Sequence, residues 1–309
     1  MQNVNTSPLL DLSVIILTRN EEIHIQRCLK NVKQFSDRIF IVDCFSTDKT
    51  IEIAEAMGVT VIQHEWPGNH GMQFNWALEH IPIDTSWILR LDADEYLLPE
   101  TIAELRRTLP LLSEKYTSIS MPLARIWMGR RIRFGTGVVI LRRFFRHGVG
   151  RSDVRLMDEC IVTDHGEDYQ LRGAFADDNL NDLSWWTEKH LNYAIREAVA
   201  MLETKFNLSP TIELEQWRKL GRSSTSKRRK KLGYARLPLF WRALAYFIYR
   251  YFFRLGFLEG RQGFCWHFFQ GLWYRMMVDA KLYEIQRACG NDLEKIRNYI
   301  LKYYQITLG

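Results

Sequence analysis

The chain has 309 residues, of which 47% are hydrophobic and 25% charged, and its formal net charge is +6. This composition is typical of a globular protein and excludes a disordered or fibrous chain. Five scattered cysteines without a CxxC pair argue against a disulfide framework and a zinc site, and they favour a reducing compartment. The polar N-terminus, residues 1–11, lacks the basic-then-apolar pattern of a secretory signal, so we expect a cytoplasmic protein.

The first half of the chain alternates between strand and helix patterns. Short apolar runs, largely β-branched, predict strands at residues 12–17, 38–42, 60–63 and 87–91. Amphipathic stretches and capping residues predict helices at residues 23–35, from Thr47 or Asp48 to Met57, at 70–80 and at 99–109. Strands separated by helices of this length indicate right-handed βαβ units, and therefore an α/β fold with a parallel sheet.

The second half of the chain has a different pattern. Residues 118–162 predict shorter strands and turns, and residues 183–206 return to a helical pattern. Residues 221–231 (GRSSTSKRRKK) have the composition of a linker, and an aromatic-rich segment follows over residues 234–283. We therefore expect an α/β domain over residues 1–220 and a basic, aromatic-rich helical region over residues 221–309.

Polar residues follow three of the predicted strands, at 18–22, 43–48 and 92–95. Because ligands of such sheets bind beyond the carboxyl ends of the strands, these residues mark the predicted site. Neither GxGxxG nor GxxxxGK[ST] follows the first strand, which disfavours a dinucleotide site and a P-loop.

The strongest local signal is the pair Asp92 and Asp94 after a buried strand. Two such carboxylates can hold a hard divalent cation, Mn²⁺ or Mg²⁺, that bridges the phosphates of a nucleotide diphosphate. A polar strand end, or a helix cap ahead of Pro99, is the alternative interpretation.

Three motifs in order carry a resemblance to a known family: residues 14–22 (VIILTRNEE), 41–50 (IVDCFSTDKT) and 91–95 (LDADE). They closely resemble the family-2 glycosyltransferases with a GT-A fold, in the bacterial branch that builds lipopolysaccharide core, capsule and exopolysaccharide. The similarity covers residues 11–206. It implies a Rossmann-like, mixed but mainly parallel sheet flanked by helices, a catalytic domain over residues 1–220, a UDP-sugar donor and a divalent metal.

The resemblance also implies roles for individual residues. Asp94 resembles the principal metal ligand, with Asp92 near the metal or the ribose. Thr18 and Glu22 would lie by the base and ribose, and Asp43 would accept a hydrogen bond from the base. The whole predicted nucleotide-sugar site consists of polar residues at the three strand ends, namely Thr18, Arg19, Asn20, Glu22, Asp43, Ser46, Asp48, Arg90 and Asp92.

Some of these assignments have alternatives. Asp48 would help to close the pocket, but it is equally well explained as a helix N-cap, and Ser46 as a turn residue. Relatives often carry a basic residue where this chain has Phe74, so Arg19 or Arg90 would contact phosphate instead.

An inverting transfer needs a base that takes the proton of the acceptor hydroxyl. By resemblance, residues 151–162 (RSDVRLMDECIV) hold the catalytic carboxylate, and we favour Glu159 over Asp158. A solvated acidic turn is the alternative. Trp186 and His190 could line the acceptor cleft, although a packed helix explains their spacing equally well.

Positive charge is concentrated in the C-terminal region. Between Trp217 and Arg261, thirteen Lys and Arg residues stand against the single Glu259, which leaves the rest of the chain with a net charge of −6. On a helical wheel, arginines gather on one side and apolar residues on the other: Arg242, Arg250, Arg254 and Arg261 against Trp241, Leu244, Ile248, Phe252 and Leu255.

This pattern predicts an amphipathic helix that lies in the interface of an anionic membrane, assisted by the basic residues 227–231. The arginines that interrupt the apolar run argue against a full span. Packing of the helix on its own domain is the alternative.

Together these features predict an inverting, metal-dependent glycosyltransferase at the inner face of the cytoplasmic membrane. It would move a hexose from a UDP-sugar to a lipid-linked, lipopolysaccharide or capsular glycan. The alternative is a non-enzymatic nucleic-acid-binding protein that uses KRRKK and the interleaved aromatics. It is disfavoured because the basic residues are confined to one segment, and because carboxylate-rich strand ends would repel phosphate without a metal.

Overall fold

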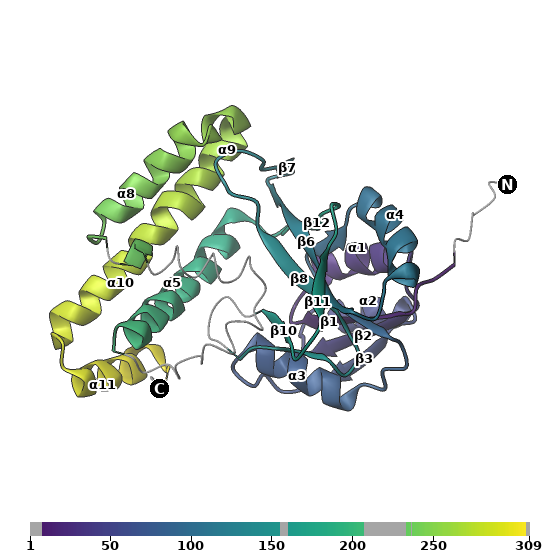
Figure 1. Ribbon diagram of the computed structural model, residues 1–309. Helices are drawn as coiled ribbons and strands as arrows, with labels where there is room; N and C mark the ends of the chain where they lie inside the picture. Colours follow the sequence, from purple (N-terminus) through teal and green to yellow (C-terminus); the bar gives the residue numbers. More distant parts are fainter. Residues whose placement is uncertain (1–7, 155–159, 207–232, 236, 307–309) are drawn as a thin grey trace.

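The computed structural model describes residues 8–154, 160–206, 233–235 and 237–306 of the chain. In Figure 1, an α/β layer built by the first half of the chain lies beside a layer of long helices, most of them from the last third. No helix within the described ranges is both long and apolar enough to cross a membrane. The predicted domain boundary at residue 220 and the basic residues 227–231 lie outside the described residues, so both stay predictions.

Ten of the described strands form one mixed sheet in the order β3-β2-β1-β4-β8-β6-β12-β5, with β7 and β11 also paired to β6. These strands are β1 (Leu12–Thr18), β2 (Arg38–Asp43), β3 (Thr60–Gln63), β4 (Trp87–Asp92), β5 (Glu95–Leu97), β6 (Tyr116–Trp127), β7 (Arg130–Arg131), β8 (Ile140–Arg146), β11 (Glu167–Gln170) and β12 (Phe175–Asp177). A separate antiparallel pair consists of β9 (Gly150–Ser152) and β10 (Ile161–Thr163).

The strands from the first part of the chain are parallel to one another. β2 and β4 flank β1, and β3 lies beside β2. β8 then pairs antiparallel with both β4 and β6, which makes the sheet mixed. All four strands predicted from apolar runs are present, three of them one residue longer than predicted. The predicted α/β class, a mixed and mainly parallel sheet flanked by helices, is confirmed.

Helices cover both faces of this sheet because successive side chains of a strand point to opposite faces. Val14 and Ile16 of β1 lie in the core with α1, α2 and α4, whereas Ile15 lies in a second core with Phe74 of α3. The four helices are α1 (Glu22–Val32), α2 (Thr50–Ala56), α3 (His70–His80) and α4 (Pro99–Thr108).

The helical layer has its own core, in which α5 packs along α10 and α11. Its elements are α5 (Leu183–Lys205), α8 (Trp241–Ile248), the π-helical turn η2 (Tyr249–Phe253), the 3₁₀ turn η3 (Gly256–Glu259), α9 (Gly260–Trp266), the π-helical η4 (His267–Trp273), α10 (Tyr274–Cys289) and α11 (Leu293–Tyr304). α5 precedes the predicted boundary in sequence, yet it packs with the C-terminal helices.

The structure corrects the predicted amphipathic helix in two ways. The helix is not continuous, because Leu255 has a left-handed backbone (φ 60°) that separates η2 from η3 and α9. Its arginine side is also divided: Arg242 and Arg250 face inward and are 2% and 5% exposed, whereas Arg254 and Arg261 are exposed. Trp241, on the predicted apolar side, is 72% exposed. Arg242 is buried because it forms an ion pair with Asp279 of α10, a partner that a helical wheel does not contain.

Candidate active site

The carboxyl ends of β1, β2 and β4 meet at one edge of the sheet. Thr18 of β1 lies in register with Asp43 of β2, and Leu17 with Asp92 of β4. The polar residues that follow these strands are therefore neighbours, although they are far apart in sequence. This is the edge at which open α/β sheets bind ligands.

Asp43 organises the first group of these residues from a fully buried position. Its Oδ2 accepts hydrogen bonds from Thr18 Oγ1 (2.7 Å) and Ser46 Oγ (2.5 Å), and its Oδ1 accepts one from the Ser46 N–H (2.7 Å). These bonds satisfy the buried carboxylate and fix the start of the β2–α2 loop. Asp43 is closed off from solvent, and its predicted hydrogen bond to a base stays a prediction.

Reciprocal hydrogen bonds join the β1–α1 loop to the β2–α2 loop. The Asn20 N–H donates to Ser46 Oγ (2.8 Å), and Asn20 Oδ1 accepts from the Thr47 N–H (2.8 Å). Glu22 Oε2 accepts from the Lys49 N–H (3.0 Å). The predicted residues Asn20, Glu22 and Ser46 thus hold together the two loops that would form the nucleotide site.

Asp48 performs a structural task that the sequence left open. One carboxylate oxygen accepts from the Thr50 N–H (3.0 Å) at the start of α2, and the other accepts from the Glu22 N–H (3.0 Å). Burial raises the pKa of Asp48, but the hydrogen bonds from Thr50 and Glu22 outweigh it, so the pKa lies below its usual value. Asp48 thus bonds to the first residue of α2 but is not its N-cap, which is Lys49, and a contact with a ligand stays a prediction.

Asp92, at the end of β4, keeps its negative charge. Its side chain is 43% exposed and lies 3.7 Å from the Arg143 guanidinium. Burial alone would raise the pKa of Asp92, but Arg143 and then Arg90 outweigh it and hold the pKa below its usual value. Glu95 pairs with the same Arg143 but is buried, and burial raises the pKa of Glu95 well above its usual value.

Asp94 is held by the segment that precedes α5. Its Oδ2 accepts from Asn179 Nδ2 (3.0 Å), and its backbone carbonyl accepts from the Asp178 N–H (3.1 Å). Arg27 of α1 fixes that segment, because its Nη1 donates to Asp178 Oδ2 (2.7 Å). Asp177, also near Asp94, has its pKa raised to about 6, first by burial and then by the Asp94 charge.

The pair Asp92 and Asp94 fits a divalent cation that arrives with a nucleotide. Within the described residues, no three His, Cys, Asp or Glu side chains are grouped to hold a metal. Mg²⁺ is commonly bound through one or two carboxylates, with substrate phosphates and water in the remaining positions. Two neighbouring carboxylates at a strand end meet that requirement, whereas a closed protein cage is not present in this part of the chain.

Sequence analysis missed a cation near these carboxylates. Lys189 of α5 lies over the ring of Trp185, 4.4 Å from its centroid. Burial lowers the pKa of Lys189, but Tyr193, Asp94 and Glu21 outweigh it and raise the pKa above its usual value. Lys189 directly precedes His190 and follows Trp186 by three residues, and these two residues of α5 are the ones predicted to line the acceptor cleft.

The predicted bases Asp158 and Glu159 lie outside the described residues. Asp153 and Cys160, on either side of this segment, are joined by a backbone hydrogen bond in which the Asp153 N–H donates to the Cys160 carbonyl (3.0 Å). Ser152 receives hydrogen bonds from Asn75 Nδ2 on its carbonyl (2.9 Å) and from Arg90 Nη1 on its hydroxyl (3.3 Å). The assignment of the base stays a prediction.

Arg19 and Arg90 occupy different environments. Arg19 is exposed at the end of β1, where it is accessible to a ligand. Arg90 is 5% exposed, and its guanidinium lies over the Phe74 ring, 5.4 Å from the centroid. Phe74 thus packs against the guanidinium of an arginine that comes from β4.

Trp186 and His190 belong to a packed aromatic cluster between the two layers. Their rings stack with centroids 3.5 Å apart, and Trp186 also contacts Trp127 of β6 and Phe269 of η4. Trp186 is 7% exposed, and burial lowers the pKa of His190 to about 4. Packing accounts for their helical spacing, and contact with an acceptor stays a prediction.

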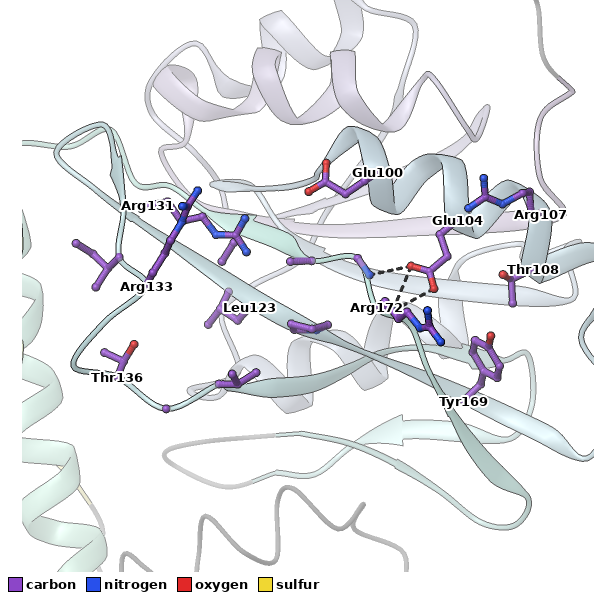
Figure 2. Close-up of a pocket in the computed structure, with 17 residues that line it drawn as sticks. Glu100, Glu104, Arg107, Thr108, Leu123, Arg131, Arg133, Thr136, Tyr169 and Arg172 are labelled. Atoms are coloured by element: carbon purple, nitrogen blue, oxygen red, sulfur yellow. Dashed lines mark hydrogen bonds between the residues drawn. The ribbon is translucent and has the colours of Figure 1, made fainter. Parts of the chain in front are cut away.

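A cavity of about 830 Å³ lies elsewhere, between α4, β6 and the loops after β7 and β11. Figure 2 shows Arg131 and Arg133 toward one end and Arg107 and Arg172 toward the other, with Glu104 bonded to the backbone N–H of Arg172. Its lining contains no residue predicted for the site.

Comparison with known proteins gives a family for the segment that carries these strand ends. Residues 13–112 match the family described as Glycosyl transferase family 2. This segment contains all three motifs and the residues Thr18, Asp43, Asp92 and Asp94. This segment is therefore similar to the family-2 glycosyltransferases.

Curated relatives match the same part of the chain. An uncharacterized glycosyltransferase of Rickettsia bellii is 38% identical over 89 residues, which is 29% of each chain. One of Rickettsia felis is 42% identical over 89 residues, 29% of this chain and 30% of the relative. The glycosyltransferase SunS of Bacillus subtilis is 29% identical over 103 residues, 32% of this chain and 24% of the relative. The matched segment thus spans about a third or less of these relatives.

Solved structures are similar at lower identity. The mannosyltransferase PcManGT of Pyrobaculum calidifontis, in complex with GDP-Man and Mn²⁺, is 15% identical with a TM-score of 0.44, over 90% of this chain and 88% of that one. Glucosyl-3-phosphoglycerate synthase of Mycobacterium tuberculosis, in complex with Mn²⁺ and UDP-glucose, is 21% identical with a TM-score of 0.30, over 36% of this chain and 43% of that one. At these TM-scores neither structure supports an argument about the ligands of this chain.

Proposed function

We propose that the chain is an inverting glycosyltransferase that takes a hexose from a UDP-sugar. The observation that carries the proposal is the placement of Asp92 and Asp94 at the strand edge shared with Thr18 and Asp43. These residues lie in the segment that matches the family-2 glycosyltransferases.

The nucleotide would bind across the ends of β1, β2 and β4. The hydrogen-bonded β1–α1 and β2–α2 loops and the end of β4 would contact it. The proposed contact residues are Thr18, Arg19, Asn20, Glu22, Asp43, Ser46, Asp48, Arg90 and Asp92. Asp94 and Asp92 would hold Mn²⁺ or Mg²⁺, which when bound supplies positive charge for the diphosphate leaving group. Lys189, whose charge interacts with Asp94 and Asp92, would add a protein cation to the site.

The transfer itself would be a single displacement. The acceptor hydroxyl oxygen forms a bond to the anomeric carbon, the bond from that carbon to the diphosphate oxygen breaks, and UDP leaves. Glu159, or its neighbour Asp158, takes the hydroxyl proton. The flanks of this segment support the assignment, since Ser152 is bonded to both Arg90 and Asn75.

The acceptor is proposed to be a lipid-linked, lipopolysaccharide-type or capsular glycan at the inner face of the cytoplasmic membrane. Support comes from the basic, aromatic-rich composition of residues 217–283. For the alternative, nucleic-acid binding, Arg242 and Arg250 are buried and unavailable to phosphate, and the exposed arginines Arg254 and Arg261 lie among large apolar side chains.

A panel of UDP- and GDP-sugars tests the proposal. Hydrolysis or transfer should occur with a UDP-hexose and Mn²⁺, and excess chelator should stop it. Turnover of no nucleotide sugar, or full turnover in chelator, would contradict the proposed reaction.

A further inference from the structure

Exposed apolar side chains gather at one end of the helical layer. Among the described residues, 25 large hydrophobic side chains are exposed, and 11 of them lie between Leu237 and Phe264. Seven surround the turn that joins α8 to α9, and we call them the aromatic tip: Tyr249, Phe252, Phe253, Leu255, Phe257, Leu258 and Phe264. Soluble surfaces rarely expose so many large apolar groups together, so this tip needs a partner.

The aromatic tip is built around a packed interior. Tyr251 contacts the rings of Phe257 and Phe264, with centroids 6.4 Å and 5.8 Å away. Beneath it, His267 is fully buried against Gly135 and Gly256, where an added Cβ would clash with the imidazole ring. The tip is therefore a shaped surface with a supported interior.

A loop of the α/β layer also holds the tip in place. Glu259 is 2% exposed, and its carboxylate accepts hydrogen bonds from the Phe134 N–H (2.7 Å) and from Arg130 Nε (3.2 Å). The Gly135 N–H donates to the Arg254 carbonyl (2.8 Å). Whatever the tip binds is thus fixed in orientation relative to β6 and the sheet.

The charge around the tip identifies the kind of partner. Glu259 is the only acid between Leu237 and Arg275, and it is buried and hydrogen-bonded. Arg254 and Arg261 are exposed beside the apolar side chains. Aromatic and aliphatic groups bordered by exposed arginines, without exposed acids, complement a bilayer whose surface carries anionic phosphates.

We propose that the aromatic tip inserts into the interface of an anionic phospholipid membrane, with Arg254 and Arg261 on the lipid phosphates. This deepens the proposed membrane location and rests on it. As in the helix expected from the helical wheel, the apolar side enters the lipid, but Arg242 and Arg250 stay inside the protein instead of facing the lipid phosphates.

Vesicle co-sedimentation of the full-length protein tests this surface. The vesicles contain phosphatidylglycerol and phosphatidylcholine, or phosphatidylcholine alone. Electrostatic attraction is screened at about 1 M salt, where the Debye length is about 3 Å, whereas apolar insertion persists. Binding to the anionic vesicles should therefore contain a salt-resistant part, and Phe252→Ser/Phe253→Ser should weaken that part at least about tenfold.

Matched variants separate the two contributions. Arg254→Gln/Arg261→Gln should weaken binding at low salt and leave the salt-resistant part unchanged. Leu111→Ser, which removes an 85% exposed side chain from the α/β layer, should behave as wild type. If circular dichroism shows that the double Phe variant is unfolded, Phe257→Ser/Leu258→Ser at the same tip takes its place.

Wild-type-like binding of a folded tip variant at high salt would overturn the proposal. The proposal would also be overturned if sedimentation velocity without vesicles showed a wild-type dimer and the tip variants were monomeric. A second copy of the chain would then occupy the tip. Vesicle binding is measured without any sugar donor. If the protein binds vesicles but shows no transferase activity, the proposed reaction is refuted and this inference stands. If it transfers sugar but the tip variants bind vesicles like wild type, this inference is refuted and the proposed reaction stands.

Discussion

The ion pair between Arg242 and Asp279 is buried in the helical layer, with both side chains 1% exposed. Asp279 Oδ1 accepts from Arg242 Nε (2.8 Å), and its Oδ2 accepts from the Phe240 N–H (2.7 Å). Asp279→Asn keeps the shape of the side chain but leaves the arginine charge buried without a counter-charge. Removal of one partner of a buried pair costs about 3–5 kcal/mol. At roughly 2–4 °C per kcal/mol, the melting temperature should fall by about 6–20 °C.

Thermal unfolding followed by circular dichroism measures this effect, and Asp84→Asn is the matched control. Asp84 pairs with Arg38 at 3.2 Å, but the two side chains are 60% and 51% exposed, and such surface pairs contribute about 0–1 kcal/mol. Arg242→Met/Asp279→Leu removes both charges and should recover much of the loss. If Asp279→Asn lowers the melting temperature no more than Asp84→Asn does, Arg242 is not an internal residue and its inward orientation is wrong.

Three further outcomes concern the site and the aromatic tip. Glu159→Gln should lower the transfer rate by about 10²–10⁴-fold with donor affinity retained, and a larger loss in Asp158→Asn would make Asp158 the base. Lys189→Met should weaken UDP binding in calorimetry, because the charge of Lys189 interacts with the site carboxylates, and Lys189→Arg should retain most of the affinity. A wild-type affinity for UDP in Lys189→Met would contradict this role. The pKa of His267 is lowered to about 4, first by burial and then by Arg250, from 6.5 in an exposed histidine. Because the unfolded chain binds more protons between these values, stability should fall as the pH drops from 6.5 to 4. His267→Leu should flatten that slope in thermal melts, and an unchanged slope would refute the assignment.

The parallel half of the sheet could be predicted because its signals are local. Residues 12–17 and 87–91 are apolar runs of strand length, and the polar residues that follow them meet at one edge once the strands are parallel. The antiparallel insertion of β8 between β4 and β6 depends on pairing with a strand more than fifty residues away, as between Leu89 and Phe144. No local pattern contains that information.

The site was predicted in the same partial way. Asp92 and Asp94 are visible as a motif, whereas Lys189, whose charge interacts with theirs, lies on a helix about a hundred residues later. The helical wheel grouped Arg242 with Arg250 correctly, but it could not show which side of the helix faces the protein. That orientation depends on Asp279, 37 residues away in sequence.

Calorimetric titration of UDP, with and without Mn²⁺, tests the central claim most directly. Wild-type protein should bind UDP more tightly when Mn²⁺ is present and should prefer UDP to GDP. Asp94→Asn should lose the Mn²⁺-dependent part of the affinity while its melting temperature stays close to that of wild type, because Asp94 makes one side-chain hydrogen bond, to Asn179. Equal UDP affinity in excess chelator, or an undiminished Mn²⁺ effect in Asp94→Asn, would contradict the assignment of a metal-assisted nucleotide-sugar site to this strand edge.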